Sequence, residues 1–152
     1  MKKTLVFSAI FILAIALCSC SKNTTASTSY GMDADINSIH FSATGSANVV
    51  ATVITNPSDA TKKQLTIVGT SATKHIIITI GNYTVSQTVY PIDLTGNGAI
   101  AVWSSGSGPD LIANSGSLTV TKSGTSYQGS FNFANSGSGL SVVNGTFVAA
   151  GN

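Results

Sequence analysis

The chain has 152 residues, a length typical of one domain, and only 8% of them are charged, against about 25% in an average soluble domain. Ser, Thr, Gly and Asn make up 67 of the residues, while Arg and Glu do not occur. So few basic residues exclude a nucleic-acid-binding surface, and the composition excludes a coiled coil. Abundant Val, Ile, Leu and Phe argue against a fully disordered chain.

The N-terminus has the features of an export signal. Lys2 and Lys3 precede an apolar run over residues 5–17, which is shorter than the about 20 residues that a membrane-spanning helix needs. A positive start followed by a short apolar segment predicts a cleaved secretory signal peptide whose apolar part is helical.

The residues that follow, Leu17-Cys18-Ser19-Cys20, resemble the lipobox of bacterial lipoproteins. Leu17 lies three positions before Cys20 and the small Ser19 directly before it, whereas a frame ending on Cys18 would place the bulky Leu17 at the cut. The resemblance implies cleavage between Ser19 and Cys20, diacylglycerol on the Cys20 thiol and acylation of the new amine. Several acyl chains on one residue anchor a protein stably in a membrane. An ordinary secretory signal with two incidental cysteines is the alternative.

Cleavage at this point changes the charge and the cysteine content. The remaining chain has five Lys and five Asp, so the formal charge of +2 belongs to Lys2 and Lys3 and indicates no attraction to polyanions. Cys18 leaves with the signal and Cys20 carries lipid, so no disulfide is expected. Ser21 in place of Asp after the lipidated residue resembles the sorting signals of some Gram-negative bacteria for the outer membrane. It implies an envelope location in the periplasmic leaflet of that membrane.

These signals divide the chain into three parts. Residues 1–19 are the predicted signal peptide, and residues 20–31 are the lipidated cysteine and a Ser/Thr-rich tether. Eleven flexible residues have a root-mean-square reach of roughly 18 Å. Residues 32–152 form one domain without a capped helical stripe. Strand-like segments at spacings of about 8–12 residues predict an all-β fold, either an antiparallel β-sandwich or a partly closed β-barrel of about 7–9 short strands.

The predicted strands show period-two alternation or short β-branched runs. They lie at residues 34–36, 39–41, 47–55, 65–70, 75–80, 99–103, 118–122, 127–133 and 141–149. Asn37-Ser38 between the first two predicts a hairpin. The strand at 47–55 is expected to be buried on both faces, and residues 57–63 to form a loop. Residues 104–109 and 135–139 are rich in Gly and Ser and predict flexible loops.

Alternation is clearest in three of these strands. Ile76, Ile78 and Ile80 are expected on one face, as are Leu118 and Val120. A shared face is likewise predicted for a mostly aromatic set, Tyr127, Gly129, Phe131 and Phe133. Asn144-Gly145 interrupts the last strand and predicts either a β-bulge or a tight turn.

The C-terminal residues 116–152 carry the sequence GSFNF at 129–133 and VNGTF at 143–147. With the lipobox, the tether and the hairpin at 32–41, they resemble small Gram-negative envelope lipoproteins, and residues 116–152 are similar to the end of one uncharacterised all-β family of these. The resemblance covers the C-terminal third well and the middle loosely. It implies an all-β fold and an envelope location, and it supplies no catalytic residues because that family has no assigned activity.

Residues suited to catalysis are few. His40 and His75 are the two histidines, and no G-x-S-x-G motif accompanies them, so exposed strand histidines are the simpler interpretation. The five Asp form no favoured glycosidase pair, and no phosphate-binding glycine loop is present. The sequence therefore predicts no enzyme, no catalytic residue and no cofactor. A hydrolase that uses His40 or His75 with Asp93 or Asp110 is the remaining alternative.

Metal binding is also not expected. Asp33, Asp35 and Asn37 match the first half of a calcium loop, but Thr44 stands at the twelfth position, where that loop needs a bidentate Glu. Two distant histidines do not make a zinc site. A strand with these polar residues on its wet face explains the spacing.

Aromatic residues suggest one ligand site. Trp103 ends a predicted strand before a Gly/Ser loop, and Tyr83 and Tyr90 flank residues 85–89. An exposed platform of these rings would stack on sugars. In the alternative interpretation, Trp103 is a core residue paired with Phe131 or Phe147.

The sequence thus predicts a membrane-anchored envelope lipoprotein with a non-catalytic β-domain in a structural or partner-interaction role, the partner being an envelope protein or a glycan. The alternative is a module that binds a carbohydrate or a small apolar ligand.

Overall fold

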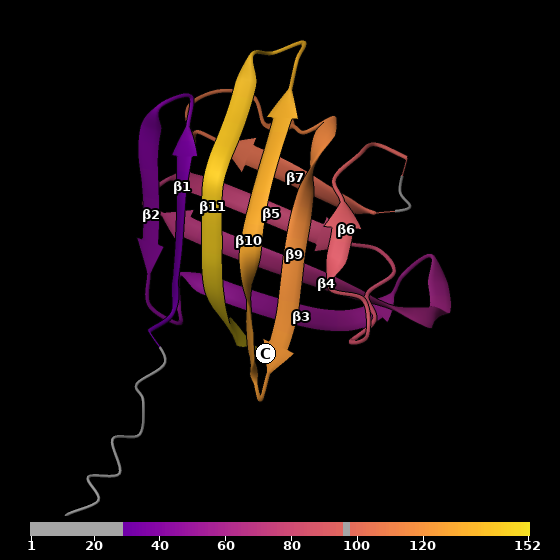
Figure 1. Cartoon of the computed structure of the whole chain (residues 1–152). Coiled ribbons are helices and arrows are strands. Elements are labelled where there is room, and N and C mark those ends of the chain that lie inside the picture. Colours follow the sequence, from indigo (N-terminus) through magenta and orange to yellow (C-terminus); the bar gives the residue numbers. More distant parts are fainter. Residues whose placement is uncertain (1–28, 96–97) are drawn as a thin grey trace, which may run out of the picture.

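The structure is a computed structural model that describes residues 29–95 and 98–152. The predicted signal peptide, the Ser19–Cys20 cleavage point and most of the tether lie outside these residues. The described residues form eleven strands and no helix, so the predicted all-β fold is confirmed (Figure 1). Within these two ranges there is accordingly no helix that is long and apolar enough to cross a membrane.

The strands exceed the predicted number because some are very short. β6 has three residues and β8 has two, too few for alternation to be visible in the sequence. In chain order the strands are β1 (Gly31–Ile36), β2 (Ile39–Thr44), β3 (Val49–Asn56), β4 (Asp59–Ser71), β5 (Lys74–Ile80), β6 (Val89–Pro91), β7 (Ala99–Ser104), β8 (Leu111–Ile112), β9 (Ser115–Ser123), β10 (Ser126–Asn135) and β11 (Leu140–Gly151).

One continuous sheet folds into two layers whose strands cross each other (Figure 1). The front layer has the order β2-β1-β11-β10-β9-β6 and the back layer the order β3-β4-β5-β7-β8. The layers join where the end of β11 runs parallel to β3, with Ala150 opposite Val50, and where Ile92 pairs with Ala99. The sheet is therefore mixed rather than purely antiparallel as predicted. It is sandwich-like and does not close into a barrel.

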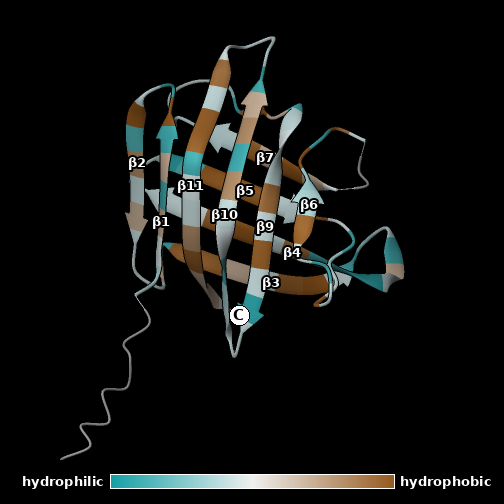
Figure 2. Ribbon diagram, in the orientation of Figure 1, coloured by the Kyte–Doolittle hydropathy of each residue, from teal (hydrophilic) through white to brown (hydrophobic). Residues whose placement is uncertain are grey.

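The core fills the space between the layers. Ile76, Ile78 and Ile80 of β5 are fully buried, and Leu118 and Val120 of β9 face them from the front layer's side, as the alternation predicts. Among the described residues the core contains no buried polar or charged side chain other than tyrosine. Figure 2 shows the resulting bands of apolar and polar residues along the front strands. Removal of this apolar surface from water is the main term that stabilises the fold.

Two expectations for the back layer were wrong. β3 is not buried on both faces: Val49 and Ala51 face the core, while Thr52 and Ile54 are exposed on the outer side. A continuous apolar run does not reveal whether its second face is covered. Residues 57–63 are not a loop either, because β4 begins at Asp59, which pairs directly with Asn56 of β3.

The β1–β2 hairpin has the predicted two-residue turn. Asn37 and Ser38 adopt φ values of 48° and 69°, as the mirror-image turns that suit twisted strands require. Asn37 also fastens the turn to β11. Its backbone N–H donates to the Ser141 carbonyl at 2.9 Å, and its side-chain oxygen accepts the Ser141 N–H at 2.7 Å. This hairpin forms one wall of the cleft described below.

The interruption in β11 is a bulge and not a tight turn. The strand continues from Leu140 to Gly151, while its pairing with β10 shifts between Phe131 and Phe133. Asn144 adopts a φ of 55°, which is typical of the extra residue at such a site. The bulge turns the Asn144 side chain toward β1.

Candidate functional site

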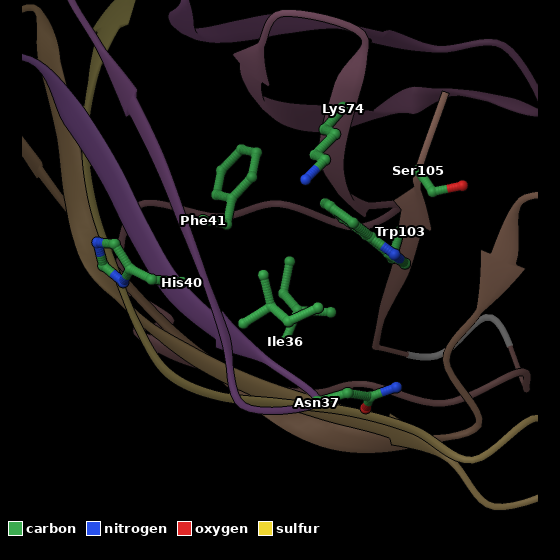
Figure 3. A pocket seen from close by; sticks show the side chains of 8 residues that line it. Ile36, Asn37, His40, Phe41, Lys74, Trp103 and Ser105 are labelled. Atoms are coloured by element: carbon green, nitrogen blue, oxygen red, sulfur yellow. The ribbon is translucent and has the colours of Figure 1, made fainter. Parts of the chain in front are cut away.

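A cleft of about 210 Å³ opens between the β1–β2 hairpin and the adjoining ends of β5 and β7 (Figure 3). We call it the Trp103 cleft. Apolar side chains from both layers make its walls, and a few polar groups lie at its rim. The lining residues are Ile36, Asn37, Ile39, His40, Phe41, Lys74, Trp103 and Ser105.

Residue size along β7 explains why the cleft opens here. Ala99 and Ala101 point into the core beneath the front layer, and Trp103, the next inward position, lies where β7 reaches the edge strand β2. Its ring meets that of Phe41 edge to face, with centroids 5.7 Å apart, a geometry that aromatic pairs favour. Trp103 therefore packs on Phe41 and not on Phe131 or Phe147. Its ring is partly exposed and forms a wall of the cleft.

The charged rim of the cleft consists of one lysine. In Figure 3 the amino group of Lys74 points toward the space between Phe41 and Trp103. The ion pairs of the described residues join His40 to Asp33 and Asp35 and Lys62 to Asp59, and none of them includes Lys74. Lys74 is the one lysine in the lining, and no Asp belongs to it, so a bound anion would meet the Lys74 ammonium group without a carboxylate in the lining.

His40 faces away from the cleft interior (Figure 3) and belongs to a polar cluster on the outer side of the front layer. Its Nε2 lies 3.6 Å from Asp33 Oδ1 and its Nδ1 lies 3.4 Å from Asp35 Oδ1. The Asn144 amide donates to the other Asp35 oxygen at 2.9 Å. The hydrogen bonds from Asn144 and His40 lower the pKa of Asp35 because they favour its charged form.

Neither histidine lies in a catalytic arrangement of the type considered from the sequence. His75 Nδ1 lies 3.2 Å from the Thr70 hydroxyl on the neighbouring strand, and His40 contacts the two carboxylates above. Within the described ranges no group of three or more His, Cys, Asp and Glu side chains is arranged to hold a metal ion.

Tyr83 and Tyr90 do not join Trp103 in an exposed platform. They are only 7% and 1% exposed, and Tyr83 packs edge to face on Tyr127 at 6.0 Å. The Tyr90 hydroxyl oxygen lies 3.1 Å from the carbonyl oxygens of both Thr84 and Gln87 and donates its hydrogen to this pair. The turn before β6 therefore satisfies the hydroxyl inside the core. Burial also raises the pKa of Tyr83. The expectation of an exposed platform made of all three rings was therefore wrong, because two of the rings lie in the core.

Sequence reasoning missed a second surface, on the outer side of the back layer. One β-branched residue from each of the five strands lies in register across this face, and we call this set the apolar row: Val50, Val68, Ile77, Val102 and Ile112. Ile112 is 47% exposed. A second line of paired residues crosses the same face two positions further along each strand, and it consists of Thr52, Thr66, Thr79 and Ile100. Ile100 is 40% exposed.

The outer side of the front layer is polar by comparison. In five of its six strands the corresponding register contains only polar residues: Thr119, Ser130, Thr146, Asp33 and Ser42. In the sixth strand, β6, the register ends on Val89, which pairs with Thr119 and is 58% exposed. Compared over five strands each, the two registers differ in chemistry. The Val/Ile-rich segments in β3 and β5 were the sequence signal for the apolar row, and the segment in β3 was expected to be buried on both faces.

The architecture defines the chain as a two-layer all-β domain. Comparison with known protein families, with curated proteins and with solved structures finds no match.

Proposed function

We propose that the chain is a membrane-anchored envelope lipoprotein whose non-catalytic β-domain binds a protein partner. Cleavage between Ser19 and Cys20 and lipid on Cys20 would anchor the domain, and residues 20–31 would tether it, most simply to the periplasmic leaflet of the outer membrane. The charged start, short apolar segment and lipobox support the anchor.

The apolar row is the observation that supports partner binding. Five β-branched side chains cross one outer face, and no Asp or Lys belongs to the row or to the register of Ile100. Four of the five are half-buried, and Ile112 at the edge of the row is exposed. Contiguous exposed apolar surface on a monomer marks interaction sites. A partner with a flat, uncharged apolar surface would cover this face, and the polar front face would stay in water.

The anchor is tested by two cysteine variants of the full chain expressed in a Gram-negative host. We expect Cys20→Ala to remove incorporation of radiolabelled palmitate and to leave the precursor uncleaved, because the resemblance implies that lipid is added to the Cys20 thiol before the cut. Cys18→Ala is the matched control and should leave labelling unchanged. Equal labelling of both variants would disprove the lipobox assignment.

Partner binding is tested by photo-crosslinking in cells from single positions. A benzophenone amino acid at Val102 lies in the apolar row, and one at Ser130 lies at the centre of the polar face. We expect a discrete adduct from Val102 only, and we expect Ile112→Lys beside it to abolish this adduct while Thr146→Lys does not. Equal adducts from both faces, or none from Val102, would contradict the proposal.

A second candidate function is the binding of a small ligand in the Trp103 cleft. Ile36, Phe41 and Trp103 supply apolar walls, and apolar walls with a few placed polar groups are typical of ligand sites. These walls favour an apolar ligand over a glycan, since Tyr83 and Tyr90 are buried elsewhere. The volume of about 210 Å³ lies below the roughly 300–1,000 Å³ of drug-sized pockets, so the ligand would be small.

A further inference from the structure

We propose that the Trp103 cleft binds an amphiphile with one short alkyl chain and one anionic head group, with Lys74 as the partner of the head group. The proposal rests on the second candidate function above and specifies the chemistry of its ligand.

The cleft matches a single short chain in size. A water molecule takes about 30 Å³ in the liquid, and a methylene group is of similar size, so a volume of about 210 Å³ accommodates roughly seven carbons. The volume is therefore on the scale of one chain of about six to eight carbons.

The walls of the cleft match a hydrocarbon. Ile36 and Phe41 are buried at its base, and Trp103 forms the opposite wall. Ile39 lies at the mouth and is 65% exposed, which makes it one of the most exposed large apolar residues of the described chain. A bound chain would cover Ile39 and the free side of the Trp103 ring, at a gain of about 25 cal/mol for each Å² removed from water.

The rim of the cleft matches an anion. The Lys74 ammonium group is directed toward the gap between the two aromatic rings (Figure 3), and no ion pair of the described residues includes it. The nearby carboxylates of Asp33 and Asp35 contact His40 on the outer side of the front layer, away from the cleft. An alkyl chain between the walls would place its head group at Lys74, and Ser105 at the same rim offers a hydroxyl donor.

The test uses the full chain in phosphatidylcholine vesicles and measures tryptophan fluorescence. Trp103 is the only tryptophan, so this fluorescence reports the cleft directly. The probes are 8-bromooctanoate, whose bromine quenches tryptophan at short range, and the non-brominated competitors octanoate, octyl phosphate and octanol. We expect saturable quenching by 8-bromooctanoate that octanoate or octyl phosphate reverses. Stronger competition by octanoate would indicate a free carboxylic acid as the ligand, and stronger competition by octyl phosphate a phosphate-headed one.

Two variants isolate the roles of charge and wall. Because Lys74 is exposed, its ion pair is expected to contribute modestly, so Lys74→Gln should weaken binding of the anionic probes about threefold to fivefold and leave octanol unchanged. Lys122→Gln, on β9 outside the cleft, is the matched control and should have no effect. Ile39→Asp should abolish quenching by placing a negative charge at the mouth. All three positions are exposed, and circular dichroism confirms that each variant is folded.

The outcomes separate this proposal from the function on which it rests. If octanol competes as well as octanoate and Lys74→Gln changes nothing, the anionic head group is wrong while the apolar ligand site stands. If 8-bromooctanoate does not quench Trp103 in a saturable way, or if Ile39→Asp leaves quenching unchanged, both the proposal and the apolar ligand site are overturned.

Discussion

At the scale of single residues, Gly145 shows how a missing side chain shapes the front layer. A Cβ at this position would collide with the Phe131 ring and would lie 2.6 Å from the Phe131 carbonyl oxygen. The bulge at Asn144 thus brings β11 close enough to β10 for the Phe131 ring to cover the backbone of β11 at Gly145. Only glycine permits this approach without a shift of one strand.

Gly145→Val should destabilise the protein by about 2–3 kcal/mol, because an overpacked core position forces neighbouring side chains out of place. Urea unfolding measures the loss. Gly108→Val is the control, since a Cβ there meets only the Ser105 hydroxyl at 3.4 Å, and it should cost less than about 0.5 kcal/mol. Similar losses for both variants would contradict the close packing of Phe131 on Gly145.

Asp35 links stability to acidic pH. Its pKa is lowered from 3.8 chiefly by the Asn144 amide. A carboxylate with a lowered folded-state pKa contributes stability above its unfolded pKa, and this contribution is lost as the pH falls through the folded pKa. Asn144→Gly removes the amide and suits the positive φ of 55° at this position. We therefore expect this variant to raise the pKa of Asp35 toward its usual value.

An NMR titration of the Asp35 carboxyl carbon measures this change. Asn132→Gly is the control, because the Asn132 amide donates to the Ser117 hydroxyl and not to a carboxylate. A pKa of Asp35 that is unchanged in Asn144→Gly, or equally raised in the control, would show that Asn144 does not hold the charge.

Single residues were predicted unevenly. The inward positions of β5, β9 and β10 were correct, because period-two alternation directly reflects which side chains leave water. The prediction that Tyr83 and Tyr90 are exposed was wrong. The burial of Tyr90 depends on carbonyl groups of a turn that satisfy its hydroxyl. Such a partner is visible only in the folded chain.

At the scale of elements, the β1–β2 hairpin combines a correct turn with one strained position. Ser38 has a φ of 69°, where a side chain is unfavourable, and Asn-Gly is the preferred pair for this turn. Ser38→Gly should therefore stabilise the protein by about 0.5–1 kcal/mol.

Thermal unfolding of the full chain checks this prediction. Ser42→Gly within β2 is the control and should destabilise by about 0.5–1 kcal/mol, because glycine in a strand interior carries an entropic cost. If both serine variants lower the midpoint of unfolding, the positive φ at Ser38 is not a source of strain.

Elements were predicted well where alternation or turn residues mark them, and poorly where they are very short or polar. The hairpin, β5, β9 and β10 follow from turn residues and alternation. β6 and β8 have three and two residues and exist because neighbouring strands offer them partners. β4 was shortened in the prediction because its polar first half resembles a loop, although it pairs with β3 from Asp59 onward.

At the scale of the whole molecule, the parallel contact of β11 with β3 joins the two layers. Beyond the paired residues Ala150 and Gly151, the Asn152 N–H donates to the Ala51 carbonyl at 3.0 Å. Asn152→Pro removes this donor and should cost about 1 kcal/mol, whereas Asn152→Ala retains it and should be near neutral. Chemical unfolding of the two variants measures the difference. Equal stability would show that this bond does not help to hold the layers together.

The sequence by itself determined where β5, β9 and β10 run, which faces they bury and where the first hairpin turns, because these features depend on residues that are neighbours in the chain. Tertiary structure alone decided that Trp103 meets Phe41 and that Lys74 stands at the rim of their cleft. It also decided that five Val and Ile residues align on one outer face. These groups come from strands distant in the sequence, and their meeting depends on strand order, register and the crossing of two layers, none of which local patterns encode.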